Sequence, residues 1–399
     1  QIIHKQRFSA FGMPTFFFNT IQKLTFAEQP NYMKQRISQE TIGRLVLIAL
    51  TLLLLFLRFP DWFEFSPYKV IEPYGDGVKA YTNIMYHARH DSSWTYFEGM
   101  NYPYGEHASA AVTQPLVSGA IRLISRYIVD ITPYTPPILN ATLLLGLLLG
   151  VFFLYLCFRK MEVNRWWAIA ASLGIAFLSP QLHRFVSHYG LAHIEVFPIL
   201  FYLLMRLEEE QRIGISLWIG LLVTAVSLIH FYYFAILAMT LSLYFFIGFL
   251  RKPSLRRLLR YALHFGVQIL LPLAFFYWWM YAGDTISDRS EMPWGFFYYH
   301  AIWESLVTSP HQPLFRWINE ELIAIQWGSE EGQAYLGLVA VAGLLVLAGR
   351  WITRKVKGLT ANFLSAGGTY RPFLYKMLLA SFLLMLLSFG WPFTIPGLE

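Results

Sequence analysis

Long runs of apolar residues constrain this chain more than any other feature of its sequence. Examples are IGRLVLIALTLLLLFL at 42–57, ILNATLLLGLLLGVFFLYLCF at 138–158 and AVAGLLVLAG at 340–349. Such runs approach or reach the ~20 apolar residues that cross a ~30 Å hydrocarbon core as a helix. Only 14% of the residues are charged, where a soluble domain carries about a quarter. We therefore expect an all-α polytopic membrane protein, a helical bundle with about nine or more transmembrane helices.

Hydropathy places nine spans along the chain. The predicted spans cover 42–59, 138–158, 165–179, 193–207, 214–229, 231–250, 261–281, 334–349 and 373–390. Basic residues gather before the first span and in alternate loops, which puts the N-terminus in the cytoplasm by the positive-inside rule. We expect a cytoplasmic segment over 1–41 and a transmembrane domain over 42–399, with the chain continuing beyond Glu399.

The net charge of +7 has the same origin, because the Lys and Arg residues stand in short segments between spans. We therefore expect no nucleic-acid partner. The single cysteine, Cys157, lies inside an apolar run, so no intrachain disulfide is expected.

Two outer loops, 61–137 and 283–333, are much longer than ordinary connections. Within them VSGAIRLISRYIV at 117–129 and FYYHAIWESLV at 297–307 carry apolar residues at helical spacing. We expect these pieces to form helices at the membrane interface.

Asp76, in the sequence YGDGVKAY, is the first candidate for chemistry. Glycine on either side lets the backbone turn tightly and present the carboxylate without a bulky neighbour. An acid just beyond the first span could act as general base toward an acceptor hydroxyl or amine. An aspartate that bonds its own backbone in a turn is an equally good interpretation.

The sequence HARHDSSW follows, with His87, Arg89 and His90 as candidate phosphate ligands. Asp91 fits a solvated loop better. Tyr104, in NYPYGEH, suits sugar stacking or interfacial anchoring equally. His230 lies between two predicted spans, where an ionisable residue is a functional candidate by default.

A third polar segment, SPQLHRFVSHYGLAHIEV, carries His183, Arg184, His188 and His193. The five-residue spacing of its histidines rotates each by ~140° from the last on a helix, so the three cannot share a face. We expect no metal site and no cofactor. A structural or phosphate-facing role is favoured for His183, Arg184 and His188.

The ordered set of short motifs resembles the GT-C superfamily of integral membrane glycosyltransferases, in particular its bacterial members. The motifs are GDG at 75–77, NYPYGEH at 101–107, HRFVSHYGLAH at 183–193, EEGQAYLG at 330–337 and SFGWPFTIPG at 388–397. The resemblance implies transfer of a sugar from a polyprenyl-phosphate carrier to an acceptor at the outer face of the bacterial inner membrane. Asp76 then matches the catalytic acid, and His183, Arg184 and His188 become candidates for the lipid phosphate.

One departure is that many GT-C enzymes carry adjacent acids in this loop, whereas Asp76 is followed by Gly77 and Lys79. Glu72 and Asp91 are the nearest acids in sequence. The expected partners are a lipid-linked sugar donor, membrane lipid and other membrane subunits. Two alternatives stay open: a non-catalytic scaffold subunit of GT-C type, and a transporter, which the scarcity of charges within the spans disfavours.

Overall fold

The structure is a computed structural model that describes residues 39–185, 188–281, 284, 299–325, 327, 334–358 and 365–390. The predicted segment 1–41 therefore lies outside the described residues except for its last three. By internal contacts the chain divides into residues 1–50 and residues 51–399. The description below concerns the second unit, apart from the helix Gln39–Arg58, which begins in the first.

The described structure is mostly helical and has almost no strand, which confirms the all-α class. The α-helices are α2 (Gly75–Arg89), α3 (Pro115–Tyr127), α4 (Thr135–Lys160), α5 (Arg165–Phe177), α6 (Val196–Glu210), α7 (Ile213–Ser227), α8 (Tyr232–Arg251), α9 (Leu255–Phe265), α10 (Leu271–Tyr281), α11 (Trp303–Val307), α12 (Pro313–Glu321), α13 (Leu338–Val356) and α14 (Arg371–Leu387). Short helical turns are η1 (Pro60–Phe63), η2 (Thr132–Tyr134), η3 (Pro180–Phe185), η4 (Tyr189–Leu191), η5 (Gly266–Leu270) and η6 (Ser365–Tyr370). In the described residues the only strands are β1 (Tyr96–Phe97) and β2 (Glu106–His107), which pair antiparallel.

Six helices of the described chain are long and apolar enough to cross a membrane, fewer than the nine predicted. They are Gln39–Arg58, Thr132–Lys160, Tyr189–Glu210, Tyr232–Arg251, Leu255–Tyr281 and Gly368–Leu387. The other three predicted spans are also helical but fall short. Helices α5 and α7 have 13 and 15 residues, and α13 carries Arg350, Arg354 and Lys355 in its last two turns.

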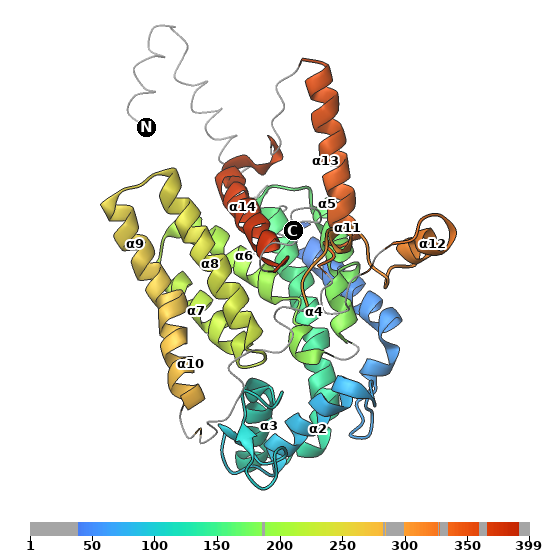
Figure 1. Cartoon of the computed structure of the whole chain (residues 1–399), viewed down its shortest axis with the longest axis vertical. Helices are drawn as coiled ribbons and strands as arrows, with labels where there is room; N and C mark the ends of the chain where they lie inside the picture. Colours follow the sequence, from blue (N-terminus) through green and yellow to red (C-terminus); the bar gives the residue numbers. More distant parts are fainter. Residues whose placement is uncertain are drawn as a thin grey trace, which may run out of the picture. The chain divides into compact units, whose positions relative to one another are not determined.

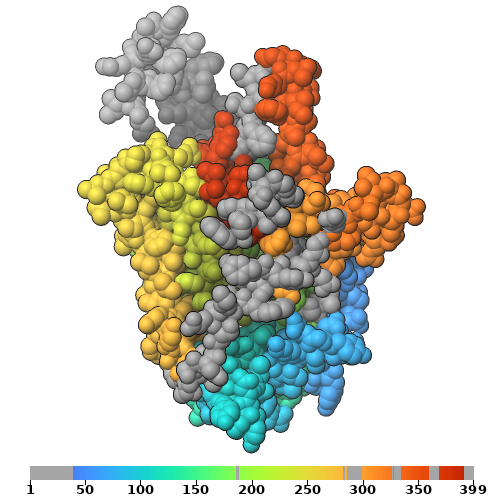
Figure 2. Space-filling view, in the orientation of Figure 1, coloured from blue at the N-terminus to red at the C-terminus, as the bar shows by residue number. Residues whose placement is uncertain are grey.

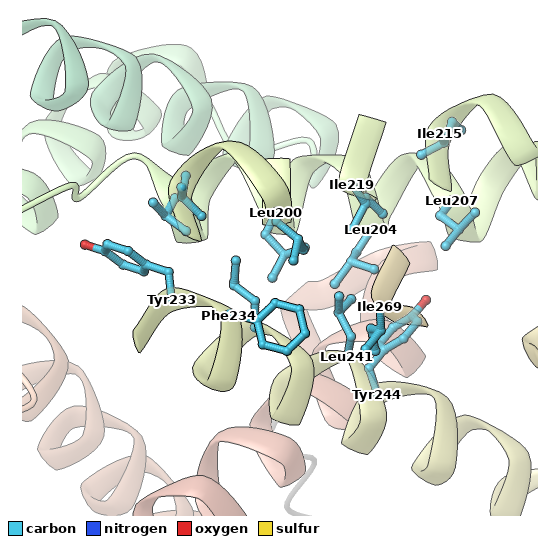
Figure 3. Close-up of a cluster of buried hydrophobic side chains, with 14 of the residues drawn as sticks. Leu200, Leu204, Leu207, Ile215, Ile219, Tyr233, Phe234, Leu241, Tyr244 and Ile269 are labelled. Atoms are coloured by element: carbon cyan, nitrogen blue, oxygen red, sulfur yellow. The ribbon is translucent and has the colours of Figure 1, made fainter. Parts of the chain in front are cut away.

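Helix α4 packs against α5 and α6, while α7 packs against α6 and α8, and α14 packs against α8. Figure 3 shows the apolar side chains that fill the space between α6, α7 and α8, among them Leu200, Leu204, Ile219 and Leu241. Gly146 and Gly150 let α4 approach the start of α6, because a Cβ at Gly150 would lie 3.2 Å from Ile194 Cγ2. Small residues four apart are a common device for close helix contact in membranes, where dispersion rather than water exclusion stabilises the contact.

One end of this bundle is basic. Helices α2 and α3 lie at one end, and the loop between α8 and α9 lies at the opposite end (Figure 1). That loop and its neighbours carry Arg251, Lys252, Arg256 and Arg257. Along the flank that α9 and α10 form, in yellow in Figure 2, the side chains of Leu259, Leu263, Leu271, Tyr277 and Trp278 are exposed. A surface of this composition is suited to lipid.

Candidate functional site

Three segments that are far apart in sequence enclose a pocket of about 400 Å³, which we call the Asp76 pocket. The first two turns of α2 contribute Asp76 and Lys79, the segment from η3 to η4 contributes Arg184 and His188, and the turn between α7 and α8 contributes His230. The remaining lining residues are Ala80, Val112, Tyr189, Gly190, Leu191 and Tyr232. The structure thus brings together three of the predicted site residues, Asp76, Arg184 and His188.

The GDG sequence begins helix α2, where the sequence suggested a turn or loop. Gly75 has φ of +56°, a left-handed conformation that glycine adopts without strain, and Asp76 stands in the first helical turn. A carboxylate there is stabilised by the N-terminal end of the helix dipole. Gly77 has a different role, because a Cβ at this position would lie 2.5 Å from Cβ and Cγ of Glu72. Gly75 therefore permits the left-handed backbone before Asp76, and Gly77 leaves room for the side chain of Glu72.

Asp76 is the only carboxylate among the described residues that line the pocket, and it faces cationic and imidazole groups. His188 Nδ1 lies 3.7 Å from Asp76 Oδ2, an ion-pair distance when the imidazole is protonated. Lys79 stands one helical turn after Asp76, on the same face of α2. A negatively charged group that enters the pocket would therefore meet Lys79 and Arg184, with Asp76 as the single carboxylate among the described lining residues.

His230 supplies a neutral imidazole to the wall of the pocket. Burial, aided by the neighbouring His188, lowers the pKa of His230 from 6.5 to about 4. The Tyr232 N–H donates to His230 Nδ1 at 3.3 Å, so the proton of the neutral ring belongs on Nε2. The ring lies close to Gly190, where a Cβ would be 3.0 Å from His230 Cδ2.

Helix α2 is anchored to the bundle just below the pocket. The Tyr81 hydroxyl donates to Asn140 Oδ1 of α4 at 2.5 Å, and the Tyr81 ring meets Tyr189 edge-on at 5.1 Å. Two residues further, Asn83 Nδ2 donates to the carbonyl of Ala111 at 2.6 Å. Since these side chains are buried, the hydrogen bonds hold the first half of α2 against α4 and against the segment between β2 and α3, and the ring contact with Tyr189 adds η4.

A second pocket of about 480 Å³, the His183 pocket, is formed by η1, the residues just before α2, the segment from the end of α5 through η3, and the residues at the start of α12. Phe185 stacks on Phe59 and on Trp62, each with ring centroids 5.4 Å apart, and His183 lies 4.2 Å from the ring of His311. Burial, with His311 and Arg58 nearby, lowers the pKa of His183. Glu72 lines this pocket and not the Asp76 pocket, although it is only four residues from Asp76.

The other predicted ligands lie outside both pockets. His87 is fully buried, with Nδ1 2.8 Å from Ser118 Oγ, and burial aided by Arg122 lowers its pKa to about 4. Arg89 and His90 are exposed at the far end of α2, ~20 Å along the helix from Asp76. Tyr104 is exposed in the segment between β1 and β2.

Asp91, for which a solvated loop was expected, is instead buried. Its Oδ1 accepts the N–H of Glu98 at 3.0 Å, and burial raises the pKa of its carboxyl. Neither Glu72 nor Asp91 therefore gives Asp76 a second acid in its pocket.

Among the lining residues that the sequence analysis did not single out are Lys79, Tyr232 and His311. Lys79 would follow from the i, i+3 spacing once a helix is assigned to 75–89. Tyr232 follows from the turn beside His230. His311 carries no local signal, because it meets His183 only through the fold.

The histidines of the third polar segment occupy three different surroundings. His183 lines one pocket, His188 lines the other, and His193 is buried with its Nδ1 2.8 Å from Glu195 Oε1. Among the described residues, no three His, Cys, Asp or Glu side chains are grouped so that they could hold a metal ion.

The long apolar helices and the Asp76 pocket define a helical membrane protein with a pocket at the start of α2. The chain belongs to the family described as a domain of unknown function, DUF6311, whose profile matches residues 46–394. No curated protein and no solved structure matches the chain.

Proposed function

We propose that the protein is a glycosyltransferase of GT-C type, which moves a sugar from a polyprenyl-phosphate-linked donor to an acceptor. The observation that carries the proposal is the Asp76 pocket, in which one carboxylate lies 3.7 Å from His188 and shares the lining with Arg184 and Lys79. The resemblance of the sequence motifs to GT-C enzymes supports it, because the matching acid lines this pocket.

The chemistry requires one base and a stabilised leaving group. Asp76 takes the proton of the acceptor hydroxyl, the acceptor oxygen bonds to C1 of the sugar, and the bond from C1 to the phosphate oxygen breaks. The electron pair stays on the phosphate, whose charge Arg184 and Lys79 stabilise. A phosphate leaves readily, so the scheme needs no general acid. Neutral His230 contributes a hydrogen-bond donor for a sugar or phosphate oxygen.

The proposal includes an orientation. The basic ends of α4, α8 and α13 face the cytoplasm of a bacterial inner membrane, and the Asp76 pocket opens at the outer face. The N-terminus is then cytoplasmic, and α5, α7 and α13 join the six long helices as spans, nine in all. The expected partners are the lipid-linked donor, surrounding lipid and further membrane subunits.

Asp76→Asn tests the proposal directly. The full chain is reconstituted in vesicles with a panel of polyprenyl-phosphate hexoses, and the release of polyprenyl phosphate is measured in the presence of cell-envelope acceptors. We expect Asp76→Asn to lower the rate by ~10²-fold or more, because a positioned base contributes 10²–10⁴-fold. The control is Glu64→Gln, since Glu64 lies outside both pockets and its side chain is 58% exposed against 57% for Asp76.

Two outcomes would overturn the proposal. Equal rates for Asp76→Asn and Glu64→Gln, at equal protein amounts, would remove Asp76 as the base. In the second outcome, the wild-type chain releases no polyprenyl phosphate from any donor of the panel, and a cell-envelope complex requires the protein but assembles equally well with Asp76→Asn. That result would establish the scaffold alternative instead.

A further inference from the structure

A groove of about 640 Å³ runs between α8, α13 and α14, away from the two pockets described above. Its lining is apolar except for two cationic side chains. The lining residues are Ile247, Arg251, Leu344, Tyr375, Lys376, Leu378, Leu379 and Phe382. Leu378, Leu379 and Phe382 are each nearly half exposed, so the groove is open along its length.

Lys376 is already neutralised inside the protein. It is 4% exposed, forms an ion pair with Glu208 of α6, and lies 4.2 Å from the centre of the Tyr244 ring. Its charge is therefore not available to a molecule in the groove, because a buried lysine with a carboxylate partner is stable only as that pair.

The charge of Arg251 at the end of α8, by contrast, is exposed. Arg251 Nη1 donates to the carbonyl of Pro372 at 3.1 Å, and the side chain has no carboxylate partner among the residues that the structure describes. Arg371 lies beside the same mouth, with its guanidinium 5.7 Å from the ring of Tyr375. Guanidinium groups have the planar donor geometry that suits phosphate.

The length of the groove matches one leaflet of a bilayer. Arg251 is level with Pro372, and ten residues of helix separate Pro372 from Phe382. Ten residues rise ~15 Å along a helix, which is half of the ~30 Å hydrocarbon core. A headgroup at Arg251 would therefore place its acyl chain along α14 as far as Phe382.

We propose that this groove binds a diacyl phospholipid with a net negative headgroup, its phosphate on Arg251 and Arg371 and one acyl chain between α8, α13 and α14. Charge complementarity decides the occupant: a cationic mouth above an apolar channel on the basic side of a bundle fits an anionic lipid better than a zwitterionic one. The site is independent of sugar transfer, because none of its residues lines the Asp76 or the His183 pocket.

Native mass spectrometry of the delipidated full chain tests the site with two probes, phosphatidylglycerol and phosphatidylcholine, at equal concentration. We expect the wild-type chain to retain phosphatidylglycerol preferentially, and Arg251→Gln to reduce that preference about fivefold, the effect of ~1 kcal/mol per basic residue near lipid. The matched control is Arg256→Gln, an exposed arginine in the first turn of α9 that does not line the groove.

Leu379→Trp supplies a second test, because the larger ring fills the apolar part of the groove and leaves both arginines in place. We expect it to displace the bound lipid while the melting temperature in detergent stays near that of the wild-type chain. Equal retention of the two lipids, an equal loss in Arg251→Gln and Arg256→Gln, or full retention in Leu379→Trp would each overturn the proposal.

Discussion

At the scale of single residues, His87 shows how burial can change the meaning of a polar residue. The sequence offered it as a phosphate ligand beside Arg89 and His90, but its side chain is inaccessible and one ring nitrogen is 2.8 Å from Ser118 Oγ. An imidazole in such surroundings stays neutral, since burial lowers its pKa to about 4. His87 therefore belongs to the packing between α2 and α3.

This pKa predicts an acid sensitivity. Between pH 6.5 and about 4 the unfolded chain binds a proton at His87 that the folded chain does not, so stability falls as the pH falls through this window. A shift of this size corresponds to about 3 kcal/mol. We expect His87→Gln to lose less stability than the wild-type chain between pH 7 and pH 4.5, measured as the melting temperature in detergent.

The neighbouring His90 provides the control, because it is exposed at the end of the same helix. His90→Gln should retain the wild-type change with pH. A His87→Gln protein whose melting temperature falls with acid as steeply as that of His90→Gln would contradict the prediction. The comparison uses changes with pH, so a constant loss of stability from the substitution does not affect it.

At the scale of elements, the start of α2 separates two acids, Glu72 and Asp76, that line different pockets. Glu72 packs on Gly77 and lines the His183 pocket, while Asp76 lines its own. We expect Gly77→Ala to destabilise the protein by ~1–3 kcal/mol, because its Cβ would lie 2.5 Å from Glu72 and force one of the segments to move.

Gly214→Ala is the matched change, since a Cβ at Gly214 meets nothing within 4 Å and alanine is the better helix former. Chemical unfolding in detergent should show a loss for Gly77→Ala and no loss for Gly214→Ala. Equal stability of the two variants would mean that the contact between Gly77 and Glu72 is not tight in the folded protein.

The sequence predicted the apolar helices well and helix α2 poorly, for a physical reason. A run such as 138–158 is helical in lipid because every backbone group must find a partner within it. Helix α2 has mixed composition and begins with two glycines in three residues, and it depends on tertiary contacts such as those of Tyr81 with Asn140 and of Asn83 with Ala111. Such contacts cannot be read from local periodicity.

The same limit applied to the candidate site. Asp76, Arg184 and His188 could be named from motifs, yet the separation of His183 from His188 follows from the path of η3 and η4. Arg89 and His90 lie outside the site because they stand at the far end of α2, a helix of 15 residues where the sequence suggested a loop.

At the scale of the whole molecule, the charges of residues 51–399 form buried or half-buried ion pairs at the basic end of the bundle and line the Asp76 pocket at the other. At the basic end, Glu208 and Glu209 of α6 pair with Lys376 and Lys160 and tie α6 to α14 and α4. At the end with α2, by contrast, Asp76 and Arg184 line a pocket with room for a ligand. We infer that these ion pairs stabilise the packing of α6 against α14 and α4, and that the end with α2 holds the proposed site of sugar transfer.

The most direct test of the central claim is to find where polyprenyl phosphate binds. A polyprenyl phosphate with a diazirine next to its phosphate is photo-crosslinked to the full chain in vesicles, and the labelled peptides are identified by mass spectrometry. We predict labels at the start of α2, between Arg184 and Leu191, and in the turn that holds His230. An excess of unlabelled polyprenyl phosphate should abolish these labels, and Arg184→Gln should reduce them. Labels confined to the lipid-facing flank of α9 and α10, unchanged in Arg184→Gln, would contradict the account.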